Sequence, residues 1–281
     1  MMRYTPLFAA AAALAIASPA AAHNHGSHEH GDHQASENAL NLNDILLHPR
    51  RAEDRARDEY RNPIETLEFF GVEPTMRVAE YGPGGGWYTR ILLPYLAPQG
   101  EYFAVQRPTG TAEDGTTWPQ RFSTAAASAG WAEGAMIGAF ETDAVPEDAA
   151  GTFDRVLIFR SLHGLLGGND ADAVLRGVRT MLSDDGMVGV VQHRAPEDAS
   201  FEDANGSRGY LRQSDVVRLF ELHGFELAGT SEVNANPNDP ADWEGGVWTL
   251  PPTLRYGDED RARYEAVGES DRMTLLFRKR D

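Results

Sequence analysis

The spacing of apolar residues predicts strands that alternate with helices over most of the chain after residue 70. The clearest strand is 153–159, whose near-continuous apolar run is typical of a strand buried on both faces of a parallel sheet. Other strands are expected at 76–81, 101–106, 135–140, 187–191, 225–231 and 273–279. This alternation predicts an α/β fold with a doubly wound, mostly parallel, Rossmann-like sheet of seven strands.

A helical extension is expected before this sheet, over residues 41–70. Alternating charges between 48 and 61 predict a solvated helix with ion pairs on its surface. Asn62, Pro63 and Glu65 then have the spacing of a helix cap, a first-turn proline and a capping box. We expect this extension to pack against an edge of the sheet.

Residues 71–281 are expected to form one domain, because no linker-like stretch divides them. Later helices are predicted at 88–96, from 174 to near Gly186, and at 214–224. The polar segment 232–271 contains Trp243 and Trp248 and reads as an insertion before the last strand. It either covers a ligand cleft or forms a surface flap without function, and the sequence leaves both open.

The stretch 76–89 is predicted to join the first strand to the first crossover helix through a glycine turn. An acid, Glu80, ends the first strand, and Gly82, Gly84, Gly85 and Gly86 follow before helical periodicity begins. Glycines there allow a tight turn and the close approach of a ligand to the backbone. A phosphate loop would need Gly-Lys-Ser/Thr, and a dinucleotide fold would need a glycine where Trp87 stands. The alternative is a tight turn that binds nothing.

The acid-x-Gly-x-Gly-x-Gly spacing resembles the first motif of class I S-adenosylmethionine-dependent methyltransferases. In the strand order of that class, the first, fourth and fifth strands are neighbours, so their carboxyl ends meet at one cleft. Arg160, His163, His193 and Arg194 follow the fourth and fifth strands.

These strand-end residues are the predicted catalytic and carboxylate-binding residues. His163 is the candidate general base, and His193 is its substitute or a substrate contact. Arg160 and Arg194 are candidates for holding a carboxylate, either of the cofactor or of the substrate. The alternative for each histidine is a purely structural, hydrogen-bonded residue at a strand end.

Further motifs extend the resemblance to a family of exported, signal-peptide-bearing predicted methyltransferases of bacteria, over roughly residue 48 to the end. They are Trp87-Tyr88-Thr89, Phe159–His163, Gln192–Pro196, Asn234–Pro237, Gly246–Pro252 and Gly268–Met273. The resemblance implies a methyltransferase-like domain with S-adenosylmethionine as cofactor, and it names no substrate. Cofactor contacts are expected from the glycine turn, Glu80, Trp87 and Arg160.

Two departures from the wider class weaken the expected nucleoside contacts. Gln106 stands where an acid usually grips the ribose hydroxyls, and it would bond them more weakly. The acid expected near the adenine is either Glu141 or Asp143. The leading hypothesis is a methyltransferase acting on a small molecule, and the alternative is a catalytically inactive binding protein with the same fold.

The first residues predict export. Arg3, the apolar run 7–16 and the small residues 20–22 have the pattern of a signal peptide over 1–22, so a periplasmic location is expected. A retained membrane anchor is the alternative, although the run is short for a bilayer. No stable membrane insertion is expected after cleavage. S-adenosylmethionine is made in the cytoplasm, so export would separate the protein from its expected cofactor.

Composition narrows the partners. The formal net charge is −18, and Lys279 is the only lysine, so nucleic acids and anionic membranes are poor partners. Cysteine is absent, which excludes disulfides. Five histidines lie in the segment 23–40, at 23, 25, 28, 30 and 33. We expect a solvated spacer with weak divalent-metal affinity there, a metal-handling role being the alternative, and no metal in the catalytic site.

Overall fold

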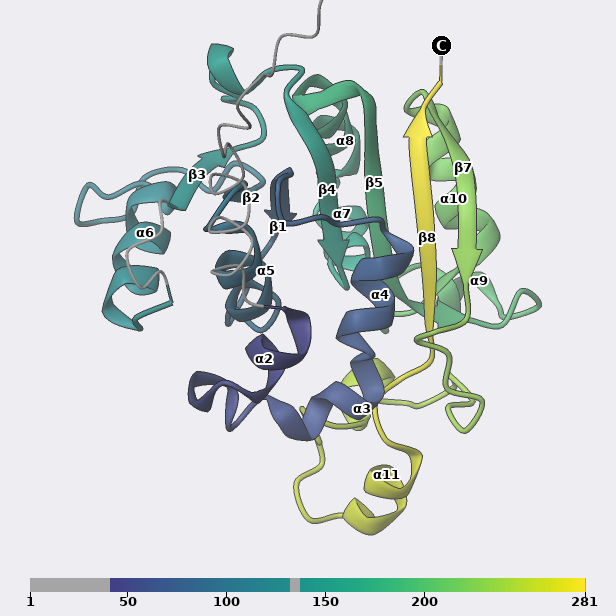
Figure 1. Ribbon diagram of the computed structural model, residues 1–281. Helices are drawn as coiled ribbons and strands as arrows, with labels where there is room; N and C mark the ends of the chain where they lie inside the picture. The colour runs from purple at the N-terminus through teal and green to yellow at the C-terminus, as the bar shows by residue number, and fades with distance from the viewer. Residues whose placement is uncertain (1–40, 132–136, 281) are drawn as a thin grey trace, which may run out of the picture. The chain divides into compact units, whose positions relative to one another are not determined.

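A sheet of parallel strands with one antiparallel strand forms the centre of the molecule (Figure 1). The computed structural model describes residues 41–131 and 137–280. The strand order is β3-β2-β1-β4-β5-β8-β7, with β8 antiparallel to both neighbours and the short β6 paired to β5. The strands are β1 Arg77–Tyr81, β2 Glu101–Gln106, β3 Ile137–Glu141, β4 Phe153–Phe159, β5 Leu182–Ala195, β6 Leu211–Arg212, β7 Phe225–Ser231 and β8 Arg272–Lys279. The predicted doubly wound Rossmann-like sheet is confirmed.

Helices cover both faces of this sheet, as the burial of β4 requires. Val156 and Ile158 pack on one face with α7 (Leu162–Gly167), α8 (Ala171–Met181) and α10 (Gln213–Leu222). Leu157 and Phe159 point to the other face, which is covered by α2 (Leu42–Leu47), α4 (Pro63–Phe69), α5 (Thr89–Leu96) and α6 (Trp118–Ser128). Alternate residues of one strand thus enter two cores, because side chains alternate along a strand.

The helical extension differs from its prediction in two ways. Residues 48–61 form the short turns η1 (Pro49–Arg51) and η2 (Arg55–Arg57) and the helix α3 (Asp58–Arg61), and two of their arginines are buried: Arg51 is 0% exposed and Arg61 2% exposed. The prediction of a solvated helix is therefore wrong, because Arg51 pairs inward with Asp58 of the same segment and Arg61 with the distant Glu269.

The packing of α4 also differs. It lies over the face of the sheet rather than its edge, with the ring of Phe70 against the backbone of Gly189 in β5. Figure 1 shows α4 in front of the strands. Asn62 makes no capping bond, since its backbone is left-handed (φ 39°) and its amide donates to the carbonyl of Val233.

Most other predicted boundaries agree with the structure to within a few residues. The exception is β5, which runs fourteen residues, whereas the sequence predicts a helix up to Gly186 and a short strand after it. α8 ends at Met181, and a Cβ on Gly186 would lie 2.5 Å from the carbonyl oxygen of Phe153. Gly186 is therefore a close-approach glycine of the sheet and not the end of a helix.

The segment 232–271 packs on its own small core next to the carboxyl ends of β1, β4 and β5. It contains η4 (Gly246–Thr249) and α11 (Arg261–Val267), and Trp243, Val247, Leu250 and Tyr264 are buried together with Tyr210. The remaining short elements are η3 (Glu147–Ala149) and α9 (Phe201–Ala204). Within residues 41–131 and 137–280, no helix combines the length and apolar character needed to cross a membrane.

Candidate functional site

The glycine turn after β1 presents bare backbone to solvent-accessible space. Gly82, Gly84 and Gly86 have φ values of +61°, +55° and +75°, a conformation that glycine adopts without strain. A Cβ on Gly85 would meet no atom within 4 Å, and one on Gly84 only a carbonyl oxygen at 3.9 Å. A Cβ on Gly86 would lie 2.4 Å from the indole of Trp131. The turn is therefore open at Gly84 and Gly85 and covered at Gly86.

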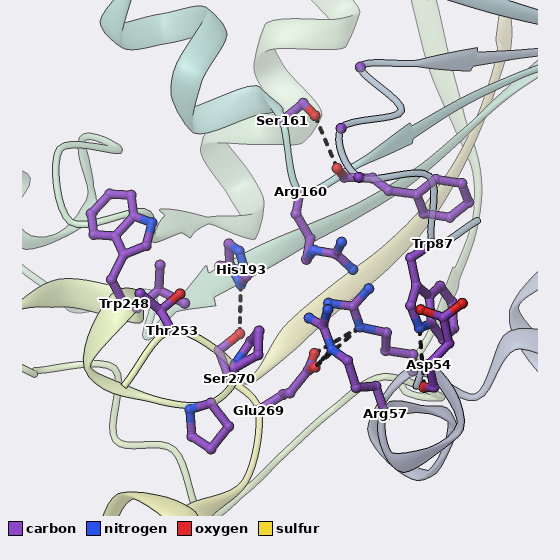
Figure 2. A pocket seen from close by; sticks show the side chains of 18 of the residues that line it. Asp54, Arg57, Trp87, Arg160, Ser161, His193, Trp248, Thr253, Glu269 and Ser270 are labelled. Atoms are coloured by element: carbon purple, nitrogen blue, oxygen red, sulfur yellow. Dashed lines mark hydrogen bonds and ion pairs between the residues drawn. The ribbon is translucent and has the colours of Figure 1, made fainter. Parts of the chain in front are cut away.

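A cavity of about 430 Å³ lies over this turn, at the carboxyl ends of β1, β4 and β5 (Figure 2). This volume is within the range of roughly 300–1,000 Å³ typical of small-molecule sites. The floor of the cavity consists of Gly82–Gly85, Phe159–Ser161, His163 and His193. Its roof consists of Asp54, Arg57 and Arg61 from the helical extension, together with Val247, Trp248, Pro251–Thr253, Glu269 and Ser270 from the segment 232–271.

The roof is joined by a cluster of arginines around one carboxylate. Glu269 accepts hydrogen bonds from Nε of Arg57 at 2.6 Å, Nε of Arg61 at 3.0 Å and Nη1 of Arg272 at 3.0 Å. Glu269, Arg61 and Arg272 are each at most 4% exposed. Three cations thus share one buried anion, although Arg57 is partly exposed. The ion pairs join the helical extension to Glu269, more than 200 positions later.

A second ion pair closes the side of the cavity. The carboxylate of Asp54 binds Arg90 through two hydrogen bonds, of 2.6 and 2.7 Å. The indole of Trp87 lies beside this pair, with the guanidinium of Arg61 over its ring at 4.7 Å and its Nε1 donating to the carbonyl of Asp54. Trp87, a predicted cofactor contact, is therefore part of the wall and leaves the space over the turn open.

Arg160 stands out among the charged residues of the floor. Its backbone is left-handed (φ 53°), and its side chain extends into the middle of the cavity in Figure 2. In the part of the chain that the structure describes, no side chain or carbonyl forms a hydrogen bond or ion pair with its guanidinium. Burial and the nearby Arg272 lower the pKa of Arg160 to about 10, which leaves it protonated at neutral pH.

His163 and His193 lie next to each other in the floor, with ring centroids 5.7 Å apart. Burial lowers the pKa of His163, with Arg160 lowering it further, and burial together with His163 and Arg160 holds the pKa of His193 well below its usual range. Both imidazoles are therefore neutral at neutral pH and able in principle to accept a proton.

The hydrogen bonds of the two rings differ. Nδ1 of His193 lies 2.6 Å from the Ser270 hydroxyl, and where it donates to that oxygen the opposite nitrogen, Nε2, is left unprotonated. Nδ1 of His163 lies 3.4 Å from the amide nitrogen of Gln192, whose other proton is donated to the carbonyl of Gly209. The acceptor nitrogen of His163 is thus already engaged. With Nδ1 of His193 as the donor, His193 is therefore better placed than His163 to act as the base.

Glu80, a predicted cofactor contact, does not line this cavity. It is 2% exposed beneath the turn and accepts hydrogen bonds from the hydroxyls of Tyr102 (2.6 Å) and Thr89 (2.7 Å). Burial raises the pKa of Glu80 to about 7, although these hydrogen bonds oppose the shift. Its observed contacts join β1, β2 and α5 below the glycines.

The predicted nucleoside contacts and Arg194 also lie outside the cavity. Glu141 accepts from the backbone and hydroxyl of Thr109, and Asp143 is exposed. The side-chain oxygen of Gln106 accepts from the backbone amide of Arg107. Arg194 forms ion pairs with Asp271 and Glu232 beside a different hollow. The expected convergence of two histidines and two arginines thus holds for His163, His193 and Arg160 but not for Arg194.

Sequence reasoning gave no chemical role to several residues that line the cavity, above all Asp54, Arg57, Arg61, Glu269 and Ser270. Three of them lie in stretches that the sequence marks as unusual. Asp54 belongs to the charge run at 48–61, which alternates in sign, and Glu269 and Ser270 belong to Gly268–Met273, one of the motifs of the family resemblance. The contact between these stretches, however, is not visible in either one alone.

The fold is that of class I methyltransferases. A proposed sarcosine dimethylglycine methyltransferase from Galdieria sulphuraria aligns with a TM-score of 0.50 and 14% identity, covering 82% of this chain and 88% of that one. Two more similar solved structures are a SAM-dependent methyltransferase from Aquifex aeolicus and the methyltransferase CalH in complex with SAH. The Aquifex protein aligns with a TM-score of 0.48 and 15% identity, covering 69% of this chain and 94% of that one. CalH aligns with a TM-score of 0.45 and 16% identity, covering 88% of this chain and 64% of that one. No protein-family model and no curated protein matches the chain.

The residues present fit S-adenosylmethionine at the turn. Gly84 and Gly85 expose backbone where an added Cβ would project into free space, and that space belongs to a cavity of small-molecule size. The order β3-β2-β1-β4-β5-β8-β7 places this turn where the strand order reverses, which is where open α/β sheets bind ligands. The fit does not extend to Gln106, Glu141 or Asp143, which do not line this cavity.

Proposed function

We propose that the protein is an S-adenosylmethionine-dependent methyltransferase acting on a small molecule. The observation that carries this proposal is the open cavity over Gly84 and Gly85 at the strand-order reversal of a class I methyltransferase sheet. When bound, the cofactor would supply a methyl group on a sulfonium, whose transfer to an oxygen or nitrogen of the acceptor leaves the carbon–sulfur electron pair on sulfur. The protein's own task is then mainly to align the two reactants and exclude water.

In this proposal the backbone of Gly82–Gly85 holds the cofactor, and a histidine of the floor receives the proton that the acceptor loses. His193 is the better placed of the two, with Ser270 positioning its ring through the 2.6 Å contact to Nδ1. His163, predicted from the sequence as the base, lies beside it and becomes the substitute, which reverses the two predicted roles. The edge of Trp248 lies against His163 and helps to enclose that side of the cavity.

The test is binding of S-adenosylmethionine and its demethylated product, measured by isothermal titration calorimetry on the purified protein. We expect saturable binding of both. Heat with neither ligand would refute the proposal. Mass spectrometry of copurifying molecules addresses the alternative, because a stable ligand unrelated to a nucleoside would favour a binding protein with this fold.

We also propose that the protein acts outside the cytoplasm, on the basis of the signal-peptide pattern at 1–22. This segment and the histidine-rich stretch 23–40 lie outside the described residues. Amino-terminal sequencing of the mature protein tests the location, and we expect it to begin at His23. A chain that retains residue 1 in the cytoplasmic fraction would contradict export.

A further inference from the structure

The charge of the cavity is opposite to that of the protein as a whole. The chain carries a formal net charge of −18, yet the cavity is lined by four arginines and two carboxylates. The arginines are Arg57, Arg61, Arg90 and Arg160, and the acids are Asp54 and Glu269. The lining therefore carries two excess positive charges, in a protein whose composition supplies many acids that could have balanced them.

The excess belongs to the arginines around Glu269 and to Arg160, because Asp54 already has a partner. Asp54 and Arg90 neutralise each other through two hydrogen bonds. Glu269 forms ion pairs with three arginines, which are Arg57, Arg61 and the buried Arg272. This cluster therefore has a surplus of positive charge. In addition, the Nη1 atom of Arg61 is buried without a hydrogen-bond partner among the described residues, although Arg61 is only 2% exposed.

Arg160 adds a further cation, for which the described residues provide no hydrogen bond or ion pair. Its guanidinium extends into the space bordered by His193 and the Arg57–Glu269 pair (Figure 2). Arg160 is partly shielded from solvent, and a guanidinium that loses contact with water is unfavourable unless an anion compensates it. The neighbouring histidines cannot do so, because they carry no negative charge: burial first, and Arg160 after it, lowers the pKa of each.

The proposed cofactor does not correct this imbalance. S-adenosylmethionine has one carboxylate but also an ammonium and a sulfonium, so it is a cation overall and would add positive charge to the cavity. The remaining occupant of a methyltransferase site is the acceptor. Guanidinium groups bind carboxylate and phosphate oxygens in fixed, bidentate geometry, which gives orientation as well as affinity.

We infer that the methyl acceptor is an anion, a small molecule with a carboxylate or phosphate group that binds Arg160 and the exposed edge of the Arg57–Arg61–Glu269 cluster. This inference rests on the proposed function, since it assigns the acceptor of that same site. The anionic group lies beside His193, so the part of the acceptor that receives the methyl group is held within reach of the neutral imidazole. Neutral and cationic acceptors would leave Arg160 uncompensated.

The experiment uses inorganic phosphate and malonate as probes, titrated into the full-length protein at constant ionic strength. The ring resonances of His163 and His193 are followed by NMR, because an anion at Arg160 raises the pKa of both imidazoles whereas binding elsewhere on the surface does not. We expect saturable shifts that are weakened at least tenfold in Arg160→Gln and also in Arg57→Gln. The control is Arg261→Gln, which removes an exposed arginine of α11 and should leave the titration unchanged.

Repeating the titration with saturating S-adenosylhomocysteine separates this inference from the proposed function. Anion binding that persists beside the bound product supports an acceptor site. Loss of anion binding on addition of the product would show that Arg160 holds the cofactor's own carboxylate, which overturns the inference and leaves the function standing. Absence of anion binding, or binding unchanged in Arg160→Gln, also overturns it. Anion binding without any product binding refutes the acceptor role together with the proposed function.

Discussion

The floor and the roof of the cavity are built by different physical means. The floor consists of strand ends and a glycine turn, held by the hydrogen-bonded sheet and by a buried, hydrogen-bonded acid beneath it, Glu80. The roof has little regular structure, and ion pairs between the helical extension and Glu269 hold it in place. The floor therefore depends on backbone geometry, whereas the roof depends on charge balance. Variants that alter only one of these should affect the two regions separately.

The largest expected effect is on the roof, from Glu269→Ala. This change leaves Arg57, Arg61 and Arg272 without their shared anion, two of them almost fully buried. Removal of one partner of a buried ion pair typically costs about 3–5 kcal/mol. We expect a loss of that size in the free energy of unfolding, measured by urea denaturation.

The matched control for Glu269→Ala is Glu265→Ala, which removes the acid of an exposed pair with Arg261 in α11. Exposed pairs contribute only about 0.2–1 kcal/mol, so this variant should remain close to the parent protein. Glu269→Gln keeps the side-chain volume and removes the charge. A loss below about 1 kcal/mol in Glu269→Ala would show that the roof does not depend on charge balance.

The same contrast explains what could be predicted from the sequence. The sheet, the glycine turn and the positions of Arg160, His163 and His193 follow from local patterns, since each strand's periodicity and its end residues are read within one short window. The burial of Arg61 could not be predicted in that way, because its partner Glu269 lies 208 positions later. An alternating charge run has the same sequence pattern whether its partners are water or a distant acid.

Two errors in the predicted site have local causes. Glu80 was expected to contact a cofactor, but a strand residue faces one side of the sheet, and on that side Tyr102 and Thr89 already surround it. Arg194 was expected in the cleft because it follows the fifth strand. The strand continues to Ala195, however, and the side chain of Arg194 pairs with Asp271 and Glu232 instead. Strand direction was predictable, but strand length and side-chain partners were not.

The next effect concerns the support of the floor and its dependence on pH. The folded-state pKa of Glu80, about 7, lies above its ordinary value of 4.5. The native protein therefore binds this proton more tightly than the unfolded chain, and its contribution is complete below pH 4.5 and is lost as pH rises through 7. The difference corresponds to on the order of 3 kcal/mol.

We expect Glu80→Gln to remove this dependence while it keeps an acceptor for Tyr102 and Thr89. The measurement is the free energy of unfolding of both proteins between pH 4.5 and 8. The stability of Glu80→Gln relative to the parent should rise across that interval. Parallel curves would mean that Glu80 has an ordinary pKa and that the acid beneath the floor is ionised at neutral pH.

A smaller effect is expected when the surface of the floor is altered without strain. Gly85 is not in the left-handed region, and an added Cβ meets nothing within 4 Å, so Gly85→Ala should change the free energy of unfolding by less than about 0.5 kcal/mol. The methyl group occupies the space proposed for the cofactor, and we expect affinity for S-adenosylhomocysteine to fall about tenfold, or about 1.4 kcal/mol. Gly167→Ala in α7, where a Cβ is equally unobstructed, is the control that should leave affinity unchanged. Unaltered affinity in Gly85→Ala would place the cofactor elsewhere.

The smallest effect tests whether charge at the centre of the cavity reaches the histidines of the floor. Arg160 is among the causes that lower the pKa values of His163 and His193, behind burial in both cases. In Arg160→Gln we expect both pKa values to rise, by less than about one unit because burial persists. Histidine ring resonances in an NMR pH titration measure this shift, with Arg261→Gln as the variant that should leave it unchanged. Because the unfolded chain takes up these protons first, the folded protein loses stability as pH falls from 6.5 toward each lowered pKa, so the substitution should also reduce the loss of stability in acid. Unchanged histidine pKa values would mean that Arg160 does not act electrostatically on the floor, and that burial alone keeps both imidazoles neutral.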